Sequence, residues 1–536
     1  MSSLVPVSAR VDAVVVGAGF AGMYAVHRLG TMGLSVQCYE AGTEVGGTWY
    51  WNRYPGARCD VESLEYSYSF DEDLQQEWVW TERYAAQPEI LAYASHVADR
   101  FDLRRHIAFE TRVTEATWAE DAGEWLVSTD AGQHLAATFL VAAVGCLSTA
   151  SVPDIEGVEH FGGQVHHTGR WPKEGVDVSG LRVGVIGTGS SAVQAIPVLA
   201  ERCEHLTVFQ RTAQYTIPAR NRPLDPADMD AVKARYPAFR AENRTTANAL
   251  SARHPPHRER AVDSTDQRRL EEFEERWDRG GTNFLAAFRD LMFDETANEY
   301  AAAFVRDKIA AIVDDPEVAR RLTPQHRIGC KRLVIDSGYY ETFNRPNVTL
   351  VDVSADPIEA ITPTGVKTAA DHVDVDVLVF ATGFDAMTGS LLRMGITGVG
   401  GRSLAEVWAA GPVNYLGLMV PGFPNLFTVT GPGSPSVLAN MVVAIEHHVE
   451  WIAECIDHVR AGTRSRIEAT DGAAEQWVAH VNAVADRTIY PSCNSWYLGA
   501  NVPGKPRVFM PLLGFPDYVS RCAAVVQDGY RGFEIG

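Results

Sequence analysis

The sequence of 536 residues predicts an α/β fold with two Rossmann-like dinucleotide-binding domains, one of them split along the chain, and a helical insertion. Three observations support this prediction. A glycine-rich turn follows an apolar run twice, the two copies share one internal spacing, and residues 223–325 show helical periodicity without clear strands. The chain is also longer than one hydrophobic core usually supports, so several domains are expected.

The first glycine-rich turn lies in VDAVVVGAGFAG (11–22) and is followed by a helical pattern. Gly17 permits the tight turn, Gly19 lets a pyrophosphate approach the backbone at the helix N-terminus, and Gly22 allows the helix to pack on the strand. The next strand, LSVQCYE, ends at Glu40. Its carboxylate is placed to accept hydrogen bonds from a ribose 2′-hydroxyl, as in an adenine dinucleotide site.

The second turn lies in RVGVIGTGSSA (182–192), where Gly187 and Gly189 are followed by an alanine in place of the third glycine. Gln210 lies 23 residues after Gly187, just as Glu40 lies 23 residues after Gly17. Here Arg211 follows instead of an acid, and a guanidinium pairs with the 2′-phosphate that a carboxylate would repel. The first site is therefore predicted to bind FAD and the second NADP. The other expected NADP contacts are Thr188, Ser190, Ser191, Gln194 and Thr212.

Strand-like and helix-like segments divide the chain into five parts. FLVAAVG (139–145) and VLVFATGFDA (377–386) resemble buried strands that close the first domain, and ATG marks a crossing between the domains. The expected boundaries are 1–150 for the first part of the FAD domain, 151–182 for a connection, 183–222 and 326–386 for the NADP domain, 223–325 for the helical insertion, and 387–536 for the second part of the FAD domain with the substrate pocket.

The composition of the chain argues against several classes of binding partner. The net charge of −21 argues against nucleic acid and against an anionic membrane surface. No apolar run approaches the roughly 20 residues of a membrane span, and the start lacks a signal-peptide pattern, so a cytoplasmic location is expected.

The eight cysteines are scattered without a CxxC pair or zinc spacing, so most are expected to be small buried hydrophobes and no metal is predicted. The oligomeric state stays open, and a monomer is compatible.

Residues 161–172, FGGQVHHTGRWP, carry the most specific motif. The spacing of Phe161, Gly163, His167 and Trp171 resembles the FxGxxxHxxxW[P/D] fingerprint of type I Baeyer–Villiger monooxygenases, which are class B flavoprotein monooxygenases. The branch with phenylacetone and steroid monooxygenases is most similar, and the cyclohexanone monooxygenase branch ranks second. Further similar segments are GGTWYWNRYPGARCDVES (46–63), GCKR (329–332), DSGYYETFNRPNV (336–348), ATGFDAMTGS (381–390), GPGSPSVLANM (431–441) and NSWYLGANVPGKPRVFMP (494–511).

The resemblance implies a reaction. NADPH reduces FAD, reduced flavin and O₂ form a C4a-peroxyflavin, and the peroxide attacks a ketone. Rearrangement then places one oxygen atom beside the carbonyl carbon and gives an ester or lactone. Aryl, cyclic or steroid-like ketones are the expected substrates, with sulfoxidation as a side activity. The flavin carries the redox chemistry, and the protein must orient and stabilise an anion.

The resemblance also implies residue roles. Arg332 matches the active-site arginine that stabilises peroxide and oxyanion, and Asp60 matches the acid that positions it. Lys331 is expected to contact NADP, and Trp496 to lie on a mobile loop near NADP and substrate. His167 is expected to couple NADP binding to domain movement; a loop histidine or an acid–base catalyst are the alternatives. The expected flavin neighbours are Thr48, Trp49, Trp51, Tyr66 and Val113. The expected substrate-pocket residues are Ser434, Pro435, Ser436, Val437 and Leu438.

Three other functions compete with this interpretation. A flavin-containing N- or S-monooxygenase is the main alternative, and Trp171 together with Arg332 argues against it. A pyridine nucleotide–disulfide reductase would share both dinucleotide turns but needs a close redox cysteine pair, which the sequence lacks. A non-catalytic NADPH-sensing flavoprotein would have no need for Arg332 and Asp60.

Overall fold

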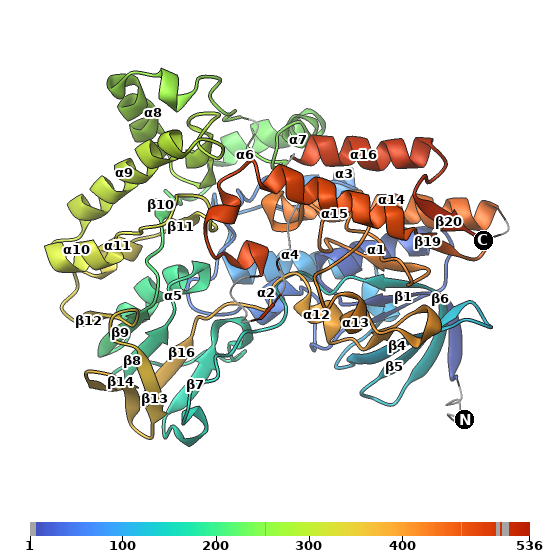
Figure 1. The fold of residues 1–536 in the computed structure, drawn as a ribbon, viewed down its shortest axis with the longest axis horizontal. Helices are drawn as coiled ribbons and strands as arrows, with labels where there is room; N and C mark the ends of the chain where they lie inside the picture. The colour runs from blue at the N-terminus through green and yellow to red at the C-terminus, as the bar shows by residue number, and fades with distance from the viewer. Residues whose placement is uncertain (1–6, 252, 463, 500–503, 506, 508–513) are drawn as a thin grey trace.

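The computed structural model describes residues 7–251, 253–462, 464–499, 504–505, 507 and 514–536. Its two largest sheets lie side by side in the lower half of Figure 1, the N-terminal sheet on the right and the second sheet on the left. Helices of the middle and C-terminal segments cover both from above. The predicted α/β class with two Rossmann-like units is confirmed.

The first sheet is built from two distant parts of the chain. Its order is β17-β4-β5-β6-β1-β2-β3, and β18 pairs in parallel with β6. The central strands β6, β1, β2 and β3 are parallel, as dinucleotide-binding folds require. The strands are β1 (Ala9–Val16), β2 (Val36–Tyr39), β3 (Ile107–Ala108), β4 (Val113–Ala119), β5 (Glu124–Thr129), β6 (His134–Ala142), β17 (Ile396–Thr397) and β18 (Leu426–Thr428).

The second sheet is entirely parallel, with the order β12-β9-β8-β16-β7. Its strands are β7 (Gln164–His167), β8 (Arg182–Ile186), β9 (His205–Gln210), β12 (Val348–Asp352) and β16 (Val377–Phe380). Two sequence interpretations need correction here. Strand β16 does not close the first domain but pairs with β7 and β8, and the connection 151–182 supplies edge strand β7. A strand made only of apolar residues is buried on both faces in whichever large sheet it joins. Its sequence pattern therefore could not show to which sheet β16 belongs.

Five α-helices, two short 3₁₀ helices (Ala261–Asp263 and Thr282–Ala286) and no strand occupy the described residues between 223 and 325. The α-helices are the main elements of this insertion. They are α6 (Pro226–Lys233), α7 (Tyr236–Arg244), α8 (Asp266–Arg279), α9 (Glu295–Ile312) and α10 (Pro316–Leu322). Side-chain oxygens cap four of these N-termini, and Asp294, for example, accepts from the backbone N–H groups of Thr296 and Ala297. Helices α8, α9 and α10 form the upper left of Figure 1, and α6 and α7 lie at its top centre.

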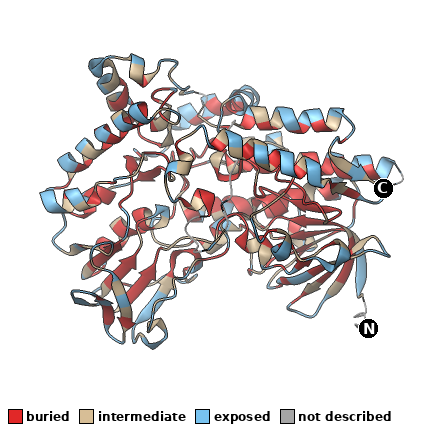
Figure 2. Ribbon diagram, viewed as in Figure 1, coloured by how far each residue is buried: buried red, intermediate tan, exposed pale blue. Residues whose placement is uncertain are grey.

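Long helix α14 (Met441–Ala461) packs against α1 (Phe20–Thr31), which follows the first glycine turn. Both helices are apolar on the face that they share, and Figure 2 shows the buried residues concentrated there and along both sheets. The remaining helices are α2 (Thr48–Trp51), α3 (Glu72–Glu77), α4 (Gln87–Arg100), α5 (Ser190–Ala200), α11 (Tyr339–Thr342), α12 (Gly389–Leu392), α13 (Leu404–Val407), α15 (Asp471–Ala485) and α16 (Phe515–Gln527).

Three small sheets complete the part of the fold that the structure describes. They are the parallel pair β10 (Thr216–Pro218) and β11 (Val334–Asp336), the antiparallel triplet β13 (Ile358–Thr362), β14 (Gly365–Thr368) and β15 (His372–Asp374), and the antiparallel pair β19 (Ile467–Ala469) and β20 (Phe533–Ile535). Among the described residues, no helix is long and apolar enough to cross a membrane.

The chain crosses twice between the two large sheets, and the two crossings pair with each other. The backbone N–H of Ser151 donates to Gly383 O over 2.9 Å, and that of Asp385 donates to Thr149 O over 2.8 Å. Ala150 and Phe384 form an antiparallel bridge between them. A short two-stranded joint therefore connects the two units.

The cysteines follow the sequence expectation in six cases and depart from it in two. Six thiols are buried without a disulfide partner. Cys330 and Cys493, which are 163 residues apart, instead form a disulfide. Their separation along the chain hid this pairing, because only the tertiary fold brings the two segments together.

Candidate active site

The first glycine turn leaves no room for side chains. Gly17 has a φ of +98°, and a Cβ atom added there would lie 2.7 Å from Ala143 O. A Cβ atom on Gly22 would lie 1.7 Å from Gly17 O. Buried Glu40 at the end of β2 accepts hydrogen bonds from the N–H groups of Ala18, over 2.8 Å, and Gly42, over 2.7 Å. The acid therefore organises the turn at the N-terminus of α1, where a dinucleotide phosphate would bind.

The segment 46–51 lies against this turn. Gly46 N–H donates to Ala18 O over 3.0 Å, and a Cβ atom on Gly19 would meet the Cα atom of Gly47 at 3.3 Å. Trp49 is buried and donates its indole N–H to the Tyr66 hydroxyl over 3.1 Å. Burial raises the pKa of Tyr66, so this hydroxyl stays neutral.

The other expected flavin neighbours differ in exposure. Thr48 is exposed at the start of α2, and Trp51 at its end is half-buried. Val113 begins β4 and is buried, two residues after Thr111, whose N–H donates to Glu40 O over 2.9 Å. Val113 therefore lies near the end of β2, and the flavin contacts expected of Thr48, Trp51 and Val113 stay predictions.

The second glycine turn repeats the first with one informative difference. Gly187 has a φ of +112°, and its added Cβ atom would lie 2.5 Å from Ala381 O. An added Cβ atom on Gly189 meets no protein atom within 4 Å. Open space beside the backbone at the N-terminus of α5 fits an approaching pyrophosphate. Thr188 donates to Thr212 O over 2.7 Å, which ties the turn to the end of β9.

Two predicted NADP contacts are engaged by the protein itself. Gln194 accepts from the Tyr54 hydroxyl over 2.8 Å and donates to Arg58 O over 3.0 Å, so its amide joins α5 to the first unit. Ser191 shares a hydrogen bond of 3.0 Å with Thr168. Gln194 therefore makes an interdomain contact, and its expected contact with NADP stays a prediction, whereas Ser190 remains exposed at the turn.

Two cations face each other beyond this turn. Arg211 and Thr212 are exposed after β9. Burial lowers the pKa of Lys331, and the positive charge of Arg211 lowers it further. Two like charges held close together favour a bound anion that neutralises both. Arg211 and Lys331 thus lie close enough to share an anion, and the NADP contacts expected of both residues stay predictions.

The guanidinium of Arg332 is fixed on two sides. Its Nε and Nη2 atoms donate to the Oδ2 atom of Asp60 over 2.9 and 2.6 Å, and Nη1 donates to Val437 O over 2.6 Å. Burial opposes the charge on Arg332, but Asp60 and the Tyr497 hydroxyl outweigh it, so the pKa of Arg332 is raised. The arginine therefore stays positively charged and has little freedom to swing.

A cavity of about 350 Å³ lies beside this pair. Asp60, Lys331 and Arg332 line its polar side. The predicted pocket loop contributes Pro435, Val437 and Leu438. Ser434 and Ser436 of the same loop are fully buried and are not among the lining residues, so their role in the pocket stays a prediction; the Ser434 hydroxyl donates to Gly431 O over 2.7 Å.

The helical insertion supplies a further wall of the cavity, and sequence reasoning did not identify which of its residues line it. Leu250, Phe288, Met292 and Phe293 line it. These apolar residues lie in irregular segments before and after α8. Neither a motif nor a periodic pattern in the sequence indicates that such segments line a pocket.

The fingerprint residues surround the joint between the units. His167 ends β7, its Nδ1 atom accepts from Gly169 N–H over 2.9 Å, and its Nε2 atom lies 3.4 Å from the Thr382 hydroxyl in the second crossing. Burial lowers the pKa of His167, which favours the neutral ring. Trp171 is buried in the core of the second unit. Coupling of the domains through His167 remains a prediction, and this position favours it.

Phe161 and Gly163 hold the start of the same segment. Phe161 packs on the core beneath β16, and a Cβ atom on Gly163 would lie 2.2 Å from Asp376 O. Only glycine therefore lets β7 approach β16 so closely at this point.

Trp496 belongs to a short helical turn (Trp496–Leu498) and contacts the ring of Tyr497 at 4.4 Å. Both pack on an apolar cluster that includes Met387 from the second crossing and Val437 from the pocket loop. Of the similar segment 494–511, residues 500–503, 506 and 508–511 lie outside the described part of the chain.

Known proteins share this arrangement over nearly the whole chain. A Baeyer–Villiger monooxygenase of Pseudooceanicola batsensis is 43% identical over 98% of this chain and 96% of its own length. The chain belongs to the type I Baeyer–Villiger monooxygenase family. The structure of an oxidised steroid monooxygenase bound to NADP is 52% identical, with a TM-score of 0.94 and coverage of 98% and 99% of the two chains.

Three further matches are consistent with the two glycine turns. The structure of OTEMO in complex with FAD and NADP is 40% identical, with a TM-score of 0.95, and 98% of this chain and 99% of that chain are covered. A phenazine N-monooxygenase of Lysobacter antibioticus is 40% identical over 97% of this chain and 96% of its length. The family model described as pyridine nucleotide-disulphide oxidoreductase matches residues 11–241.

Among the described residues, no group of three or more His, Cys, Asp or Glu side chains is placed to hold a metal ion.

The two turns generate a paired prediction. Gly22→Ala should lower the melting temperature and the FAD content, because its methyl group collides with Gly17 O; such overpacking costs about 1–3 kcal/mol. Gly189→Ala should fold with normal FAD content but raise the KM for NADPH, because its methyl group occupies the open space of the turn. An unchanged KM in Gly189→Ala would contradict the proposed phosphate approach.

Buried Glu65 generates a pH prediction. Burial, and then the charge of Glu62, raise the pKa of Glu65 to about 7, while Ser251 N–H donates to it over 3.1 Å. A raised carboxyl pKa means that the native state binds the proton more tightly, so stability is lost as the pH rises from about 4.5 to 7. Glu65→Gln should therefore gain stability relative to the natural protein over this interval, by roughly 3 kcal/mol at most.

Chemical denaturation between pH 5 and pH 8 measures this difference. Glu115→Gln, at an exposed position on β4, is the matched control and should leave the pH dependence unchanged. Parallel pH profiles for Glu65→Gln and the natural protein would show that Glu65 does not titrate in this range.

Proposed function

We propose that this protein is an NADPH- and O₂-dependent flavin monooxygenase that inserts one oxygen atom beside a ketone carbonyl and gives an ester or lactone. The observation that carries the proposal is the fixed guanidinium of Arg332, which Asp60 and Val437 O hold at the wall of a ligand-sized cavity. Lys331, which faces Arg211, lines the same cavity, so the NADP site and the ketone site adjoin.

Both cofactors fit the residues present. The crowded first turn and the segment 46–51 would hold FAD, and the open turn at Gly189 with Arg211 and Lys331 would hold NADPH. Neighbouring structures bound to FAD and NADP support this assignment. When bound, FAD accepts a hydride from NADPH and activates O₂ for transfer to the substrate.

The protein's own contribution is electrostatic. Negative charge develops on the ketone oxygen when its carbonyl carbon is attacked, and Arg332 can stabilise that charge without losing a proton, since its pKa is raised. Asp60 prevents the guanidinium from turning away, so little reorganisation is needed during the reaction. Asp60 acts through Arg332 and is therefore a positioning residue.

The cavity favours apolar ketones of moderate size. Its volume of about 350 Å³ lies within the range of small-molecule sites. Leu250, Phe288 and Leu438 line it with apolar surface, and Arg332 is among its polar lining residues. Aryl, cyclic and steroid-like ketones are the proposed substrates, and thioethers of similar shape are candidates for sulfoxidation.

Oxygenation of nitrogen is the second candidate function, and the similarity to a phenazine N-monooxygenase favours it. A panel of phenylacetone, cyclohexanone, a steroid ketone and phenazine distinguishes the two, with NADPH consumption and product mass as the readouts. Ester or lactone formation supports the main proposal. Formation of N-oxide without any ester would overturn it.

Three expectations about the molecule as a whole also stay proposals. O₂ is the proposed second substrate, a monomer is compatible with the structure, and the proposed location is the cytoplasm. The net charge of −21 continues to argue against a nucleic acid partner.

Removal of Arg211 should weaken selectivity for NADPH. A hydrogen bond to a charged group contributes about 1.5–3 kcal/mol, so Arg211→Ala should raise the KM for NADPH about 10- to 100-fold. The KM for NADH, which lacks the 2′-phosphate, should stay unchanged. Steady-state kinetics with both nucleotides test this, and an equal rise for both would show that Arg211 does not contact the phosphate.

Removal of Arg332 should abolish most of the oxygenation. Arg332→Ala should lower kcat for ester formation about 10²- to 10³-fold, the usual cost of losing one oxyanion-stabilising group. Arg182→Ala is the matched control, because Arg182 forms ion pairs with Asp374 and Asp376 away from the cavity. Product analysis by gas chromatography measures the rate. A decrease of less than threefold would contradict the role of Arg332.

A further inference from the structure

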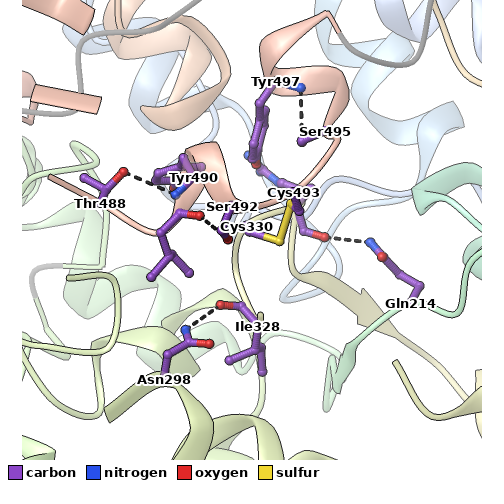
Figure 3. Close-up of a disulfide and its surroundings, with 12 residues drawn as sticks. Gln214, Asn298, Ile328, Cys330, Thr488, Tyr490, Ser492, Cys493, Ser495 and Tyr497 are labelled. Carbon is purple, nitrogen blue, oxygen red and sulfur yellow. Dashed lines mark hydrogen bonds between the residues drawn. A yellow bond between two sulfur atoms is a disulfide. The ribbon is translucent and has the colours of Figure 1, made fainter. Parts of the chain in front are cut away.

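A disulfide joins two segments that flank the cavity. Figure 3 shows Cys330 bonded to Cys493, with Cα atoms 6.2 Å apart. Neither cysteine lines the cavity, but the residues next to Cys330, Gly329 and Lys331, do, as do Tyr490 and Tyr497 on either side of Cys493. The bond therefore connects two walls of the site.

The segment around Cys330 is anchored independently of the disulfide. Asn298 on α9 donates to Ile328 O over 2.8 Å, and Gln214 donates to Arg332 O over 2.8 Å. Both hydrogen bonds are drawn in Figure 3. Cys330 itself is fully buried. This side of the bond is thus a rigid part of the second unit and the insertion.

The hydrogen bonds around Cys493 are mostly local. Ser492 donates to Ile489 O over 2.6 Å, Tyr490 N–H donates to the Thr488 hydroxyl over 3.2 Å, and Tyr497 N–H donates to the Ser495 hydroxyl over 3.2 Å. Such bonds shape the segment 488–499 locally, and its described contacts with the rest of the protein are mainly the apolar packing of Tyr490, Trp496 and Tyr497. Its contacts across the cavity include the hydroxyl of Tyr497 on Arg332 and the N–H of Ile489 on Met292 O.

We propose that Cys330 and Cys493 form a reversible redox modification site whose disulfide clamps the segment 488–499 against the segment that carries Lys331 and Arg332. Disulfides in reducing compartments are usually transient or redox-sensing rather than structural. The other six cysteines are buried single thiols, so the pairing is specific to these two positions. The proposal deepens the proposed function, on which it rests, because it regulates the same site.

The chemistry needs an oxidant, and hydrogen peroxide is the class that fits. The half-buried thiolate of Cys493 attacks one peroxide oxygen; an S–O bond forms, the O–O bond breaks, and water leaves after protonation. The thiolate of Cys330 then attacks the sulfenic sulfur, and a second water leaves as the S–S bond forms. The two sulfurs lose two electrons in total and the peroxide gains two. A dithiol reverses the change by exchange through a mixed disulfide.

The clamp should slow exchange of ligands rather than the chemistry. Tyr490, Tyr497 and neighbouring Trp496 belong to the clamped segment, so a covalent tie hinders movement of this wall when NADP⁺ or product leaves. The oxidised enzyme should therefore show a kcat several-fold lower and a slower release of NADP⁺ than the dithiol form. The ratio of ester formed to NADPH consumed should not fall.

The test compares the holoenzyme after treatment with stoichiometric hydrogen peroxide and after dithiothreitol. Differential alkylation with peptide mass mapping measures the disulfide, displacement of bound NADP⁺ measures its release, and thermal unfolding measures the clamp. We expect the Cys330–Cys493 peptide in the oxidised sample, a higher melting temperature, slower NADP⁺ release, and full reversal by dithiothreitol.

Variants separate the clamp from general oxidation. Cys493→Ser, at the half-buried position, should keep the dithiol behaviour under both treatments, and Cys203→Ser, which removes a single buried thiol, should respond like the natural protein. Cys330→Ala is the second variant of the pair. Absence of the linked peptide would overturn the proposal, and so would a linked peptide with unchanged NADP⁺ release. If NADP⁺ release and unfolding respond but no ketone is oxygenated, only the proposed function fails.

Discussion

The ion pair between Arg332 and Asp60 is the interaction on which the active site depends. It joins residues that are 272 positions apart, and the hydrogen bond from Arg332 to Val437 O adds a third segment from the C-terminal region. The pair therefore needs both dinucleotide-binding units and the pocket loop in place. A partly buried guanidinium is costly unless it is paired and hydrogen-bonded, and here both conditions hold. Stabilisation of an oxyanion follows from this arrangement.

The relative position of the two dinucleotide-binding units depends on a small set of hydrogen bonds between them. The two chain crossings bond to each other between Thr149–Ser151 and Gly383–Asp385, and His167 contacts the second crossing through Thr382. Gln194 supplies a further link from α5 to Tyr54 and Arg58. Movement of one unit would therefore alter the geometry of the cavity through a small number of contacts, which is the physical basis for coupling cofactor binding to the site.

Local signals predicted much of this structure. The two turns were visible because glycine spacing, a preceding strand and a following helix all lie within about 30 residues. The roles of Arg332 and Asp60 came from the family resemblance, since no local pattern relates residues so distant. The buried positions of Ser434 and Ser436, the insertion residues that line the cavity and the Cys330–Cys493 bond could not be predicted. Each of these features depends on which distant segments come together in the fold. The sequence around a strand or a cysteine does not indicate its distant partner.

A double-mutant cycle on the oxygenation rate tests the central claim most directly. The rate of ester formation from the reduced enzyme is measured for the natural protein, Asp60→Asn, Arg332→Lys and the double variant. If Asp60 acts by positioning the guanidinium, the double variant should be about as slow as Arg332→Lys alone, because the interaction is already lost. If the two effects add in free energy, the residues act independently, and the paired site described above would be contradicted.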